Sequence, residues 1–454
     1  MVIQKNQVTQ IIKEYCSRSL YGFVKTMWNQ IEVNPYTDNW HIETICDALQ
    51  RRYNIYAGDH KNRDTSNRYD QLFNLPPGSS KTLIINVFFP AWIWMKNPAV
   101  KTINSGYSYT IAEETSSKFL KLITSDLYTT LVDYKVVKSS LNNIKNNKGG
   151  QRFTTSTTGT ITGIHADIIF NDDPNSPKSI YSEPARNEAK TFVNEILPSR
   201  KTNLKRSYTI TVQQRLHNDD VSGEILLQNK KLEHIVIPAI NEQGESFFPE
   251  RFPLEFLLEQ KEILGSVSFN AQYLQRTQEA SGGIIKKDWL IEEELKPNTN
   301  LMYFIDSAYG GKDADYNAIL GCYVEDNNLY LQSLEINKLE FPELIKWLKI
   351  HLPHNAKVYV EGKASGKSII QTLKRNTNFN VMELQVKDSK IVRKHGVSPF
   401  FEAGRVIIDK SIRYKNELIE QLIFDETKND DILDTVMHAI EKLLKVATGK
   451  YNIR

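Results

Sequence analysis

The chain has 454 residues, with 57 Lys+Arg against 54 Asp+Glu, which leaves a formal net charge of +3. With 40% hydrophobic and 24% charged residues, it has the composition of an ordinary globular protein, which excludes disordered and fibrous chains. At about 150 residues per domain the length predicts two or three domains, and a charge balance near zero does not exclude nucleic acid, which needs only a local basic stripe.

The first half of the chain predicts a helical lead-in followed by strands that alternate with helices. The lead-in covers about residues 1–60, with apolar residues at helical spacing from Gln4 to Trp28 and a second helical stretch from His41 to Tyr53. From about Phe73 the pattern becomes strand, loop, helix. Strand-like runs then recur at KTINSGYS, HADIIFNDD, SYTITVQQ and EHIVIPAI. This alternation predicts an α/β domain with a mainly parallel sheet, over residues 1–270.

A second α/β region follows a linker. The stretch from Ser268 to Gly283 loses the apolar strand pattern and ends in Ser-Gly-Gly, so we expect a linker at 271–284. Strand-like runs then follow at LMYFIDSAYGG, NAILGCYVED, LYLQSLEIN and KVYVEGKASG, with a helix at Pro342 to His351 and a closing helix from about Asp431 to Val446. Residues 285–454 therefore predict a second domain whose sheet is partly antiparallel and partly parallel.

No segment predicts a membrane span or a secretion signal. The longest apolar stretch, Leu83 to Met95, has 13 residues, fewer than the roughly 18 that a span needs. The N-terminal segment has no apolar core or cleavage site. Cys16, Cys46 and Cys322 lie far apart, which argues against a disulfide framework and a structural zinc site. We expect a soluble intracellular protein.

Residues 75–82, Leu-Pro-Pro-Gly-Ser-Ser-Lys-Thr, resemble a phosphate-binding loop. The pattern G-x-x-x-x-G-K-[ST] has glycine where this chain has Leu75 and Ser80. In such loops backbone N–H groups cradle phosphates, the lysine reaches the outer phosphates and the hydroxyl meets Mg²⁺. The alternative is a Pro-Gly turn before a helix with a solvated lysine. The residues predicted to bind ATP here are Pro77, Gly78, Ser79, Ser80, Lys81 and Thr82.

An apolar strand that ends in two adjacent carboxylates, Asp172 and Asp173, favours the nucleotide site. A nucleotide hydrolase needs one acid to hold Mg²⁺ and another to orient or deprotonate the attacking water. We assign the first role to Asp172 and the second to Asp173. The alternative is a strand-ending turn, since Asp and the following Pro174 favour turns.

Carboxylates on two strands and one helix predict a second site. Asp306 and Glu361 end strand-like runs, and Asp431 opens the last helix. In an RNase H-like fold such acids converge to hold two Mg²⁺ ions about 4 Å apart, which cleave a phosphodiester. Each acid alone is common, because strand-end acids are frequent and Asp is an expected helix cap.

The third position of this acid set is ambiguous. Asp431 and Asp434 are three residues apart and share a helix face, so Asp431 is the preferred ligand and Asp434 the second. Asp430 is a candidate cap. Asp315 is a further candidate, or a loop acid.

Together these features look like the large terminase subunit of tailed bacteriophages. The resemblance runs from about His41 to Ala439, and the pairing of the two domains is its most specific feature. Besides the loop and the acids, it is carried by Gly159–Gly163 with His165–Ile169, Thr211–Asp220, Val360–Gly366, Val397–Val406 and Asp430–Asp434.

This resemblance implies an N-terminal P-loop NTPase domain of the ASCE type and a C-terminal RNase H-like nuclease domain. It implies a motor that uses ATP and Mg²⁺ to package duplex DNA into a procapsid and to cut the concatemer, with Mn²⁺ possible in the nuclease site. The implied partners are the portal protein and a small terminase subunit, with a ring of copies on the procapsid and a monomer otherwise. The implied location is the host cytoplasm, not the mature virion.

The chain departs from the family pattern around the phosphates. Family members often carry Arg or His inside the loop and Gly before the lysine, where this chain has serine and glycine only. An arginine finger must therefore come from elsewhere. Arg152, Arg200 and Arg215 are candidates, with insertion into a neighbouring subunit as one route.

Basic residues near the second acid set are candidates for DNA contact, since phosphate contacts dominate affinity for nucleic acid. They are Lys363, Lys367, Lys387, Lys390 and Arg393. The alternative for each is a solvated lysine-rich loop. The stretch from Asn142 to Arg152 is polar, basic and glycine-bearing, and we interpret it as a mobile surface loop; the alternative is a role in gripping DNA or in acting on a neighbouring subunit.

Two other classes of protein fit the same sequence. One is a cellular helicase-like ATPase fused to an RNase H-like resolvase, which would act on DNA junctions. The other is a non-enzymatic DNA-binding scaffold with a decayed phosphate loop, as Leu75 and Ser80 suggest.

Overall fold

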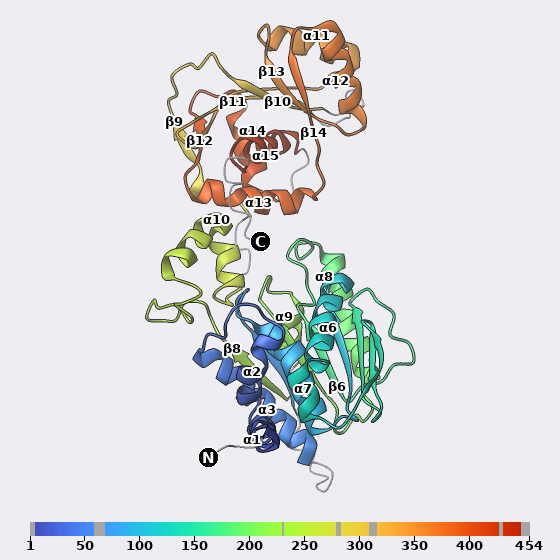
Figure 1. Cartoon of the computed structure of the whole chain (residues 1–454). Coiled ribbons are helices and arrows are strands. Elements are labelled where there is room, and N and C mark those ends of the chain that lie inside the picture. Colours follow the sequence, from blue (N-terminus) through green and yellow to red (C-terminus); the bar gives the residue numbers. More distant parts are fainter. Residues whose placement is uncertain are drawn as a thin grey trace. The chain divides into compact units, whose positions relative to one another are not determined.

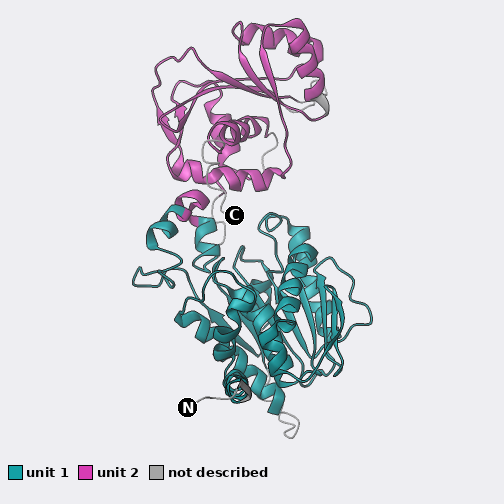
Figure 2. Cartoon of the chain, viewed as in Figure 1, with its two compact units in different colours: residues 1–259, 267–278 teal, residues 260–266, 279–454 magenta. Residues whose placement is uncertain are grey.

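A computed structural model of the chain describes residues 5–58, 69–228, 231–277, 283–307, 316–425 and 430–445. The chain forms two compact units, residues 1–259 with 267–278 and residues 260–266 with 279–454 (Figure 2). The division after residue 278 falls within the segment 271–284 in which we expect a linker. Each unit contains one mixed sheet with helices, and each is described by itself (Figure 1).

The helical lead-in consists of three helices. The helix predicted from Gln4 to Trp28 is interrupted at Ser19, whose hydroxyl accepts the Gly22 N–H at 3.0 Å and so caps a new helix. Gln4 itself lies outside the described residues. The elements are α1 (Lys5–Arg18), α2 (Leu20–Met27), the 3₁₀ turn η1 (Trp28–Gln30) and α3 (Trp40–Gly58).

The sheet of the first unit has the order β3-β4-β5-β2-β6-β7-β1-β8 and is parallel from β5 to β8. Strand β7 lies between β1, which leads into the phosphate loop, and β6, which ends at Asp172. This is the arrangement expected of the ASCE type. The strands are β1 (Asp70–Asn74), β2 (Lys101–Gly106), β3 (Val136–Ser140), β4 (Asn143–Asn146), β5 (Gln151–Ser156), β6 (Ile168–Asp172), β7 (Tyr208–Gln213) and β8 (Leu232–Val236).

The apolar run after the phosphate loop forms one helical segment with a π turn, and its two tryptophans, Trp92 and Trp94, are buried. The segment comprises α4 (Lys81–Leu83), η2 (Ile84–Phe88) and α5 (Phe89–Lys96). The other helical elements of this unit are α6 (Tyr109–Ile123), α7 (Asp126–Leu131), α8 (Glu183–Thr191), η3 (Phe192–Ile196), η4 (Leu197–Arg200) and α9 (Val221–Leu227). Helix α10 (Leu254–Gln272) is kinked at Gly265, where φ is +73°.

The prediction of a mobile loop from Asn142 to Arg152 is wrong. Residues 143–146 form β4, and β5 begins at Gln151 within this stretch; with β3 these strands extend the sheet in antiparallel fashion. The polar sequence hides them because β4 has only four residues and buries the polar Asn146 as well as Ile144, so no alternation of apolar and polar residues marks it.

The sheet of the second unit has the order β14-β13-β10-β11-β12-β15-β9. The pairs β10–β11 and β11–β12 are antiparallel and the others are parallel, which confirms the predicted mixture. The strands are β9 (Ile291–Glu293), β10 (Met302–Asp306), β11 (Asn317–Glu325), β12 (Asn328–Asn337), β13 (Lys357–Glu361), β14 (Asn380–Leu384) and β15 (Val406–Asp409).

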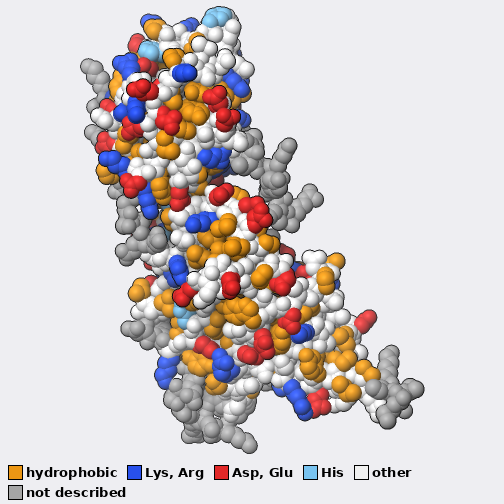
Figure 3. All heavy atoms as spheres, turned by 90° about the vertical axis from the view of Figure 1, so that its left-hand side faces the viewer, with side chains coloured by type: hydrophobic (Ala, Val, Ile, Leu, Met, Phe, Trp, Pro, Cys, Tyr) orange, Lys and Arg blue, Asp and Glu red, His pale blue; other side chains and the backbone are white. Residues whose placement is uncertain are grey.

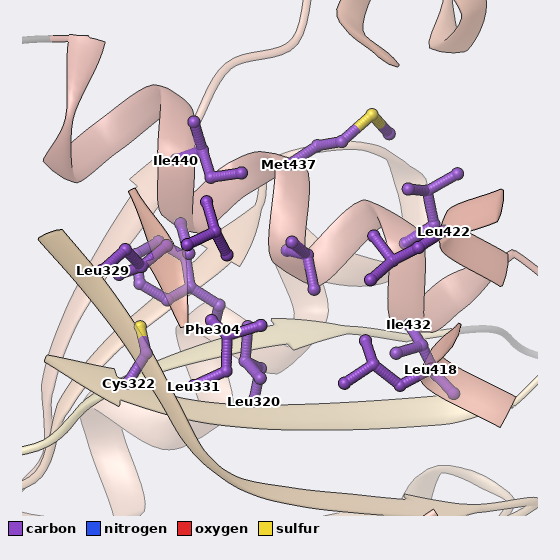
Figure 4. Packing of buried hydrophobic residues seen from close by; sticks show 14 of the residues in the cluster. Phe304, Leu320, Cys322, Leu329, Leu331, Leu418, Leu422, Ile432, Met437 and Ile440 are labelled. Carbon is purple, nitrogen blue, oxygen red and sulfur yellow. The ribbon is translucent and has the colours of Figure 1, made fainter. Parts of the chain in front are cut away.

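Two hydrophobic clusters cover the two faces of this sheet. One contains Leu344 and Leu348 of α11 and Ile369 of α12. The other contains Phe304 of β10 and buried residues of α13, α14 and α15 (Figure 4). Burial of such side chains stabilises the unit by roughly 1.5–3 kcal/mol each. The helical elements are η5 (Lys287–Trp289), α11 (Phe341–His351), α12 (Ala364–Asn376), α13 (Lys390–Glu402), α14 (Lys415–Ile423) and α15 (Asp431–Leu443).

Among the described helices, none has the length and apolar character that crossing a membrane requires.

Candidate functional sites

The phosphate loop, residues 75–82, makes a sharp turn between β1 and α4. Gly78 and Ser80 both have left-handed backbone conformations, with φ of +75° and +63°. A side chain at position 78 is excluded sterically as well, because a Cβ there would lie 2.7 Å from the ring of Phe252. The turn directs the loop backbone around the start of the helix, which is a geometry suited to phosphate.

The predicted lysine, hydroxyl and acids of the nucleotide site lie together. Lys81 Nζ donates to the carbonyl of Leu75 at 3.2 Å and lies 3.6 Å from Asp173 Oδ1. Thr82 Oγ1 donates to Asp172 Oδ1 at 3.1 Å. The fold thus brings two segments about 90 residues apart in sequence into hydrogen-bond contact.

The environment of Asp172 disfavours the ionised form of its carboxyl group. Burial, and next the neighbouring Asp173 carboxylate, raise the pKa of Asp172, while Lys81 and the Thr82 hydroxyl act in the opposite direction. A carboxylate in this position gains from a bound cation, and its oxygen donors are those that Mg²⁺ prefers.

A cavity of about 650 Å³ opens at this loop. Of the residues predicted to bind ATP, five line it: Pro77, Gly78, Ser80, Lys81 and Thr82. The sixth loop residue, Ser79, is buried, and its hydroxyl donates to the carbonyl of Pro76 at 2.9 Å. Asp173 also lines the cavity.

Residues that sequence reasoning missed complete the cavity wall. Trp28, Asn34 and Ile42 come from the helical lead-in, and Arg251 comes from the turn before α10. Behind the loop, the buried His41 lies 3.1 Å from the carbonyl of Ser79 through Nε2, and burial lowers its pKa to about 4. No motif marks these residues, because they lie on segments remote from the loop in sequence.

The segment after β7 connects the acids to helix α9. The Gln214 N–H donates to Asp173 Oδ1 at 3.1 Å. Arg215 Nε donates to both carboxylate oxygens of Asp220, at 3.1 and 3.0 Å. Asp220 is fully buried and caps α9 through the Gly223 N–H at 2.8 Å. A change at Asp173 is therefore linked by hydrogen bonds to the start of this helix.

Two of the three arginine-finger candidates, Arg152 and Arg215, are engaged inside the unit in this structure. Arg152 is fully buried and donates to the carbonyl of Asn86 at 2.8 Å. Arg215 is held by Asp220. Arg200 is half-buried, and its Nε has no hydrogen-bond partner among the described residues. Insertion of Arg152 or Arg215 into a neighbouring subunit conflicts with these contacts, because it would leave the buried carbonyl of Asn86 or the buried carboxylate of Asp220 without its partner.

In the second unit, two of the predicted acids end neighbouring parallel strands. Asp306 ends β10 and Glu361 ends β13, and the register pairs Ile305 with Val360 just before them. Both acids line a cavity of about 230 Å³ together with Ser307 and Lys363.

These acids perturb one another electrostatically. Burial, and then the charges of Asp434, Asp431 and Glu361, raise the pKa of Asp306 to about 7. A hydrogen bond from His438 at 3.2 Å is the main cause that lowers the pKa of Glu361 to about 2. The coupling of Asp306 to the other three acids indicates that they surround one site.

The remaining acids have other partners in this structure. Asp431 Oδ2 accepts the backbone N–H of Tyr316 at 3.0 Å. Asp434 is bound by Arg393 at 2.7 Å and by Lys390 at 2.5 Å. Asp430 also contacts Lys390. Asp315 lies outside the described residues.

Among the described residues, no three carboxylate, imidazole or thiolate groups already stand in a metal-binding arrangement. The donor set nevertheless suits a hard cation, because Asp306 and Glu361 offer carboxylate oxygens to one cavity. Asp306 in addition carries an unfavourable charge that a cation would offset.

The candidates for DNA contact divide into two groups. Lys363, Lys367 and Lys387 are exposed. Lys363 also pairs with Glu361 at 2.8 Å, and Lys390 and Arg393 form ion pairs with Asp434; Arg393 is only 5% exposed. A contact of Arg393 with DNA conflicts with this structure, because its guanidinium is already hydrogen-bonded to Asp434, Glu441 and His438.

His438 was missed by sequence reasoning although a signal was present. It lies four residues after Asp434 on α15, which puts it on the same face of the helix. It joins Glu361 to Arg393, with distances of 3.2 and 3.1 Å.

Part of the chain matches a known protein family. Residues 337–443 match the family model of the terminase RNaseH-like domain. The match confirms the predicted RNase H-like character of the second unit and, over this segment, the resemblance to large terminases. No curated protein matches the sequence.

Several solved structures are similar to the chain. One is the large terminase from a thermophilic bacteriophage in complex with ATP-gamma-S, at 13% identity and a TM-score of 0.49, covering 87% of this chain and 99% of that one. The HK97 bacteriophage large terminase has 9% identity and a TM-score of 0.38, with 93% and 98% covered. The g2p nuclease domain from bacteriophage SPP1 with bound Mn has 16% identity and a TM-score of 0.28, with 34% and 96% covered.

Proposed function

We propose that this chain is the large subunit of a phage DNA-packaging motor, with an ATPase in its first unit and an endonuclease in its second. The observation that carries the proposal is the contact of Lys81 and Thr82 with the acids Asp173 and Asp172 at one cavity, in a chain whose second unit matches the terminase RNaseH-like domain.

In the ATPase site, each residue has one role. The loop backbone and Lys81 bind the phosphates, and Lys81 leaves Asp173 to do so. Thr82 and Asp172 hold Mg²⁺, which neutralises charge on the phosphates. Asp173 then orients the attacking water, and the Gln214 N–H that it accepts at 3.1 Å fixes its carboxylate.

In the nuclease site, Asp306, Glu361 and Asp431 hold the divalent ions, Mg²⁺ or Mn²⁺. Ions bound there would supply a water of lowered pKa and positive charge for the leaving oxygen of a phosphodiester. Asp434 acts as the second acid of α15 and is oriented by Arg393 and Lys390. Lys363 lines the same cavity and pairs with Glu361 at 2.8 Å, so it would have to leave that carboxylate to contact a DNA phosphate.

The motor draws duplex DNA into a procapsid and cuts the concatemer when packaging starts and ends. It works as a ring of copies on the portal protein, receives DNA from a small terminase subunit, and is a monomer when alone. It acts in the host cytoplasm and is not part of the mature virion.

Plasmid cleavage with Mg²⁺ or Mn²⁺ and ATP hydrolysis, measured in parallel, test this proposal. Asp306→Ala should abolish cleavage and leave ATP hydrolysis intact, and Lys81→Ala should do the reverse. Lys138→Ala and Asp288→Ala are matched controls, because both side chains are exposed and lie outside the two sites.

Two outcomes would favour the rivals. Wild type that neither cuts DNA nor hydrolyses ATP, even with DNA present, would support a DNA-binding scaffold. Cleavage of four-way junctions in strong preference to linear duplex would support a resolvase.

A further inference from the structure

The phosphate loop has no arginine, yet one arginine lies against it. Arg251 Nη1 donates to the hydroxyl of Ser80 at 3.1 Å. Ser80 immediately precedes Lys81, and both line the same cavity as Arg251. The guanidinium is therefore next to the backbone that would surround the phosphates of a nucleotide.

The turn that carries Arg251 is firmly held. We define the aromatic turn as residues 247–252. The rings of Phe247 and Phe252 stack with centroids 5.5 Å apart, and the hydroxyl of Ser246 donates to the carbonyl of Phe252 at 2.6 Å. The indole of Trp40 donates to the carbonyl of Phe247 at 3.1 Å. The backbone on either side of Arg251 is thus anchored by these contacts, and its exposed side chain reaches the loop through Ser80.

The aromatic turn also touches the loop directly. A Cβ at position 78 would lie 2.7 Å from the ring of Phe252, so a larger residue there would require the ring to shift, and the φ of +75° would strain it as well. The aromatic turn that carries Arg251 therefore lies against the loop at Gly78.

The charges around the cavity single out Arg251. Three cations line it. Lys81 lies 3.6 Å from Asp173, and Lys118 binds Glu32 at 2.9 Å. Arg251 forms no ion pair with any residue that the structure describes; its hydrogen-bond partner, Ser80, is neutral. An exposed guanidinium without a carboxylate is suited to a bidentate contact with a phosphate.

Ser80 has a role that the family pattern does not predict. Glycine is usual before the lysine, and a serine there adopts an unfavourable φ of +63°. Its hydroxyl provides the hydrogen bond that orients Arg251. The hydrogen bond between Ser80 and Arg251 thus accounts both for a serine where the family pattern has glycine and for the position of the Arg251 guanidinium.

We infer that Arg251 acts in cis on the terminal phosphate of the bound nucleotide and supplies the positive charge that the loop lacks. This inference rests on the proposed ATPase and names the residue that the sequence left open. It predicts that ATP and its analogues depend on Arg251 and that ADP does not.

The test compares wild type with Arg251→Gln, Arg251→Lys and Ser80→Ala. Arg251→Gln should lower kcat for ATP hydrolysis about 100-fold, as loss of a charge-stabilising donor does. It should weaken binding of ATPγS at least tenfold in calorimetry, and that of ADP less than twofold. Arg251→Lys should recover part of the rate, and Ser80→Ala should lower it several-fold because only the orientation is lost. Arg18→Gln, an exposed arginine of α1, is the control.

The outcomes that overturn the inference differ from those that overturn the ATPase. Unchanged hydrolysis by Arg251→Gln, with wild type active, refutes the role of Arg251 alone. Equal loss of ADP and ATPγS affinity refutes contact with the terminal phosphate. Recovery of activity on mixing Arg251→Gln with Lys81→Ala protein refutes action in cis, since the intact arginine would then serve a neighbour's site. If wild type neither binds nor hydrolyses ATP, the proposed function fails first.

Discussion

Asp306 is a residue whose charge works against folding when no metal is bound. Its pKa rises from an ordinary 3.8 to about 7, because burial and three neighbouring acids disfavour the ionised form. A carboxyl with a raised pKa binds more protons in the folded state. Stability therefore falls as the pH rises from about 4 to 7, and the loss is complete above the folded pKa.

We predict that Asp306→Asn stabilises the metal-free protein at pH 8 by about 1–2 kcal/mol, less than the full shift implies because solvent partly reaches the site. The gain should shrink at pH 5, where wild type is protonated at Asp306 for most of the time. Urea unfolding in a chelator at both pH values measures it. Asp288→Asn, an exposed aspartate of the same unit, controls for the change of residue type. A destabilised Asp306→Asn protein at pH 8 would contradict the electrostatic account.

At the level of single residues, the sequence predicts the acidic residues of the two sites better than the residues that contact them. Asp172, Asp173, Asp306 and Glu361 follow apolar strands, and a strand end is visible in the sequence. The hydrogen bond from Arg251 to Ser80 joins positions 171 residues apart, so no local pattern contains it.

Strand β5 and the π turn η2 are joined by Arg152. Pro90, four residues after Asn86, has no N–H and so cannot donate an α-helical hydrogen bond to the carbonyl of Asn86. Arg152 donates to that carbonyl at 2.8 Å. It also reaches the hydroxyls of Ser116 and Thr115 and lies over the ring of Phe119. Arg152 thus provides a hydrogen-bond donor to the helical segment that follows the phosphate loop.

We predict that Arg152→Met destabilises the first unit by about 2–4 kcal/mol, because it leaves a buried carbonyl and two hydroxyls without partners. Thermal unfolding followed by near-UV absorbance or circular dichroism measures the loss. Mixing the variant with Lys81→Ala protein should not restore ATP hydrolysis, since the defect lies within the subunit. A variant of normal stability that recovers activity on mixing would reinstate Arg152 as a finger that acts in trans.

The elements themselves were predictable where burial imposes a pattern. Strands β6 and β10 lie in the interior and appear as apolar runs, and the buried β7 appears as apolar residues that alternate with threonine. Strand β3 does not, because four of its five residues are exposed and tolerate polar side chains. The break at Ser19 was missed for another reason: apolar spacing continues through it, and only the cap reveals a new helix.

For the molecule as a whole, the pairing of a phosphate loop with an acid strand, followed by a second acid set, could be predicted because each motif places several residue types at fixed spacing. It could not be predicted which lysines and arginines stay outside ion pairs. On the face drawn in Figure 3, Lys and Arg side chains are interspersed with Asp and Glu, as a net charge of +3 would suggest. Which of these cations are free for DNA depends on ion pairs that form only on folding.

That distinction predicts how DNA binding responds to salt. Each lysine that contacts a phosphate of duplex DNA contributes about 0.9 to the slope of log K against log salt. Lys367 and Lys387 are exposed and form no ion pair with the described residues, whereas Arg393 is bound to Asp434 and Glu441. We predict that the double variant Lys367→Gln/Lys387→Gln lowers the slope by about 2.

Arg393→Gln should leave the slope unchanged and should instead destabilise the unit, because Asp434 loses a buried partner. Fluorescence anisotropy of a labelled duplex, titrated between 50 and 200 mM NaCl (about the range over which counterion release is steep) without divalent ions, separates the two effects. A slope that falls with Arg393→Gln and not with the lysine pair would mean that the buried arginine leaves its acids when DNA binds.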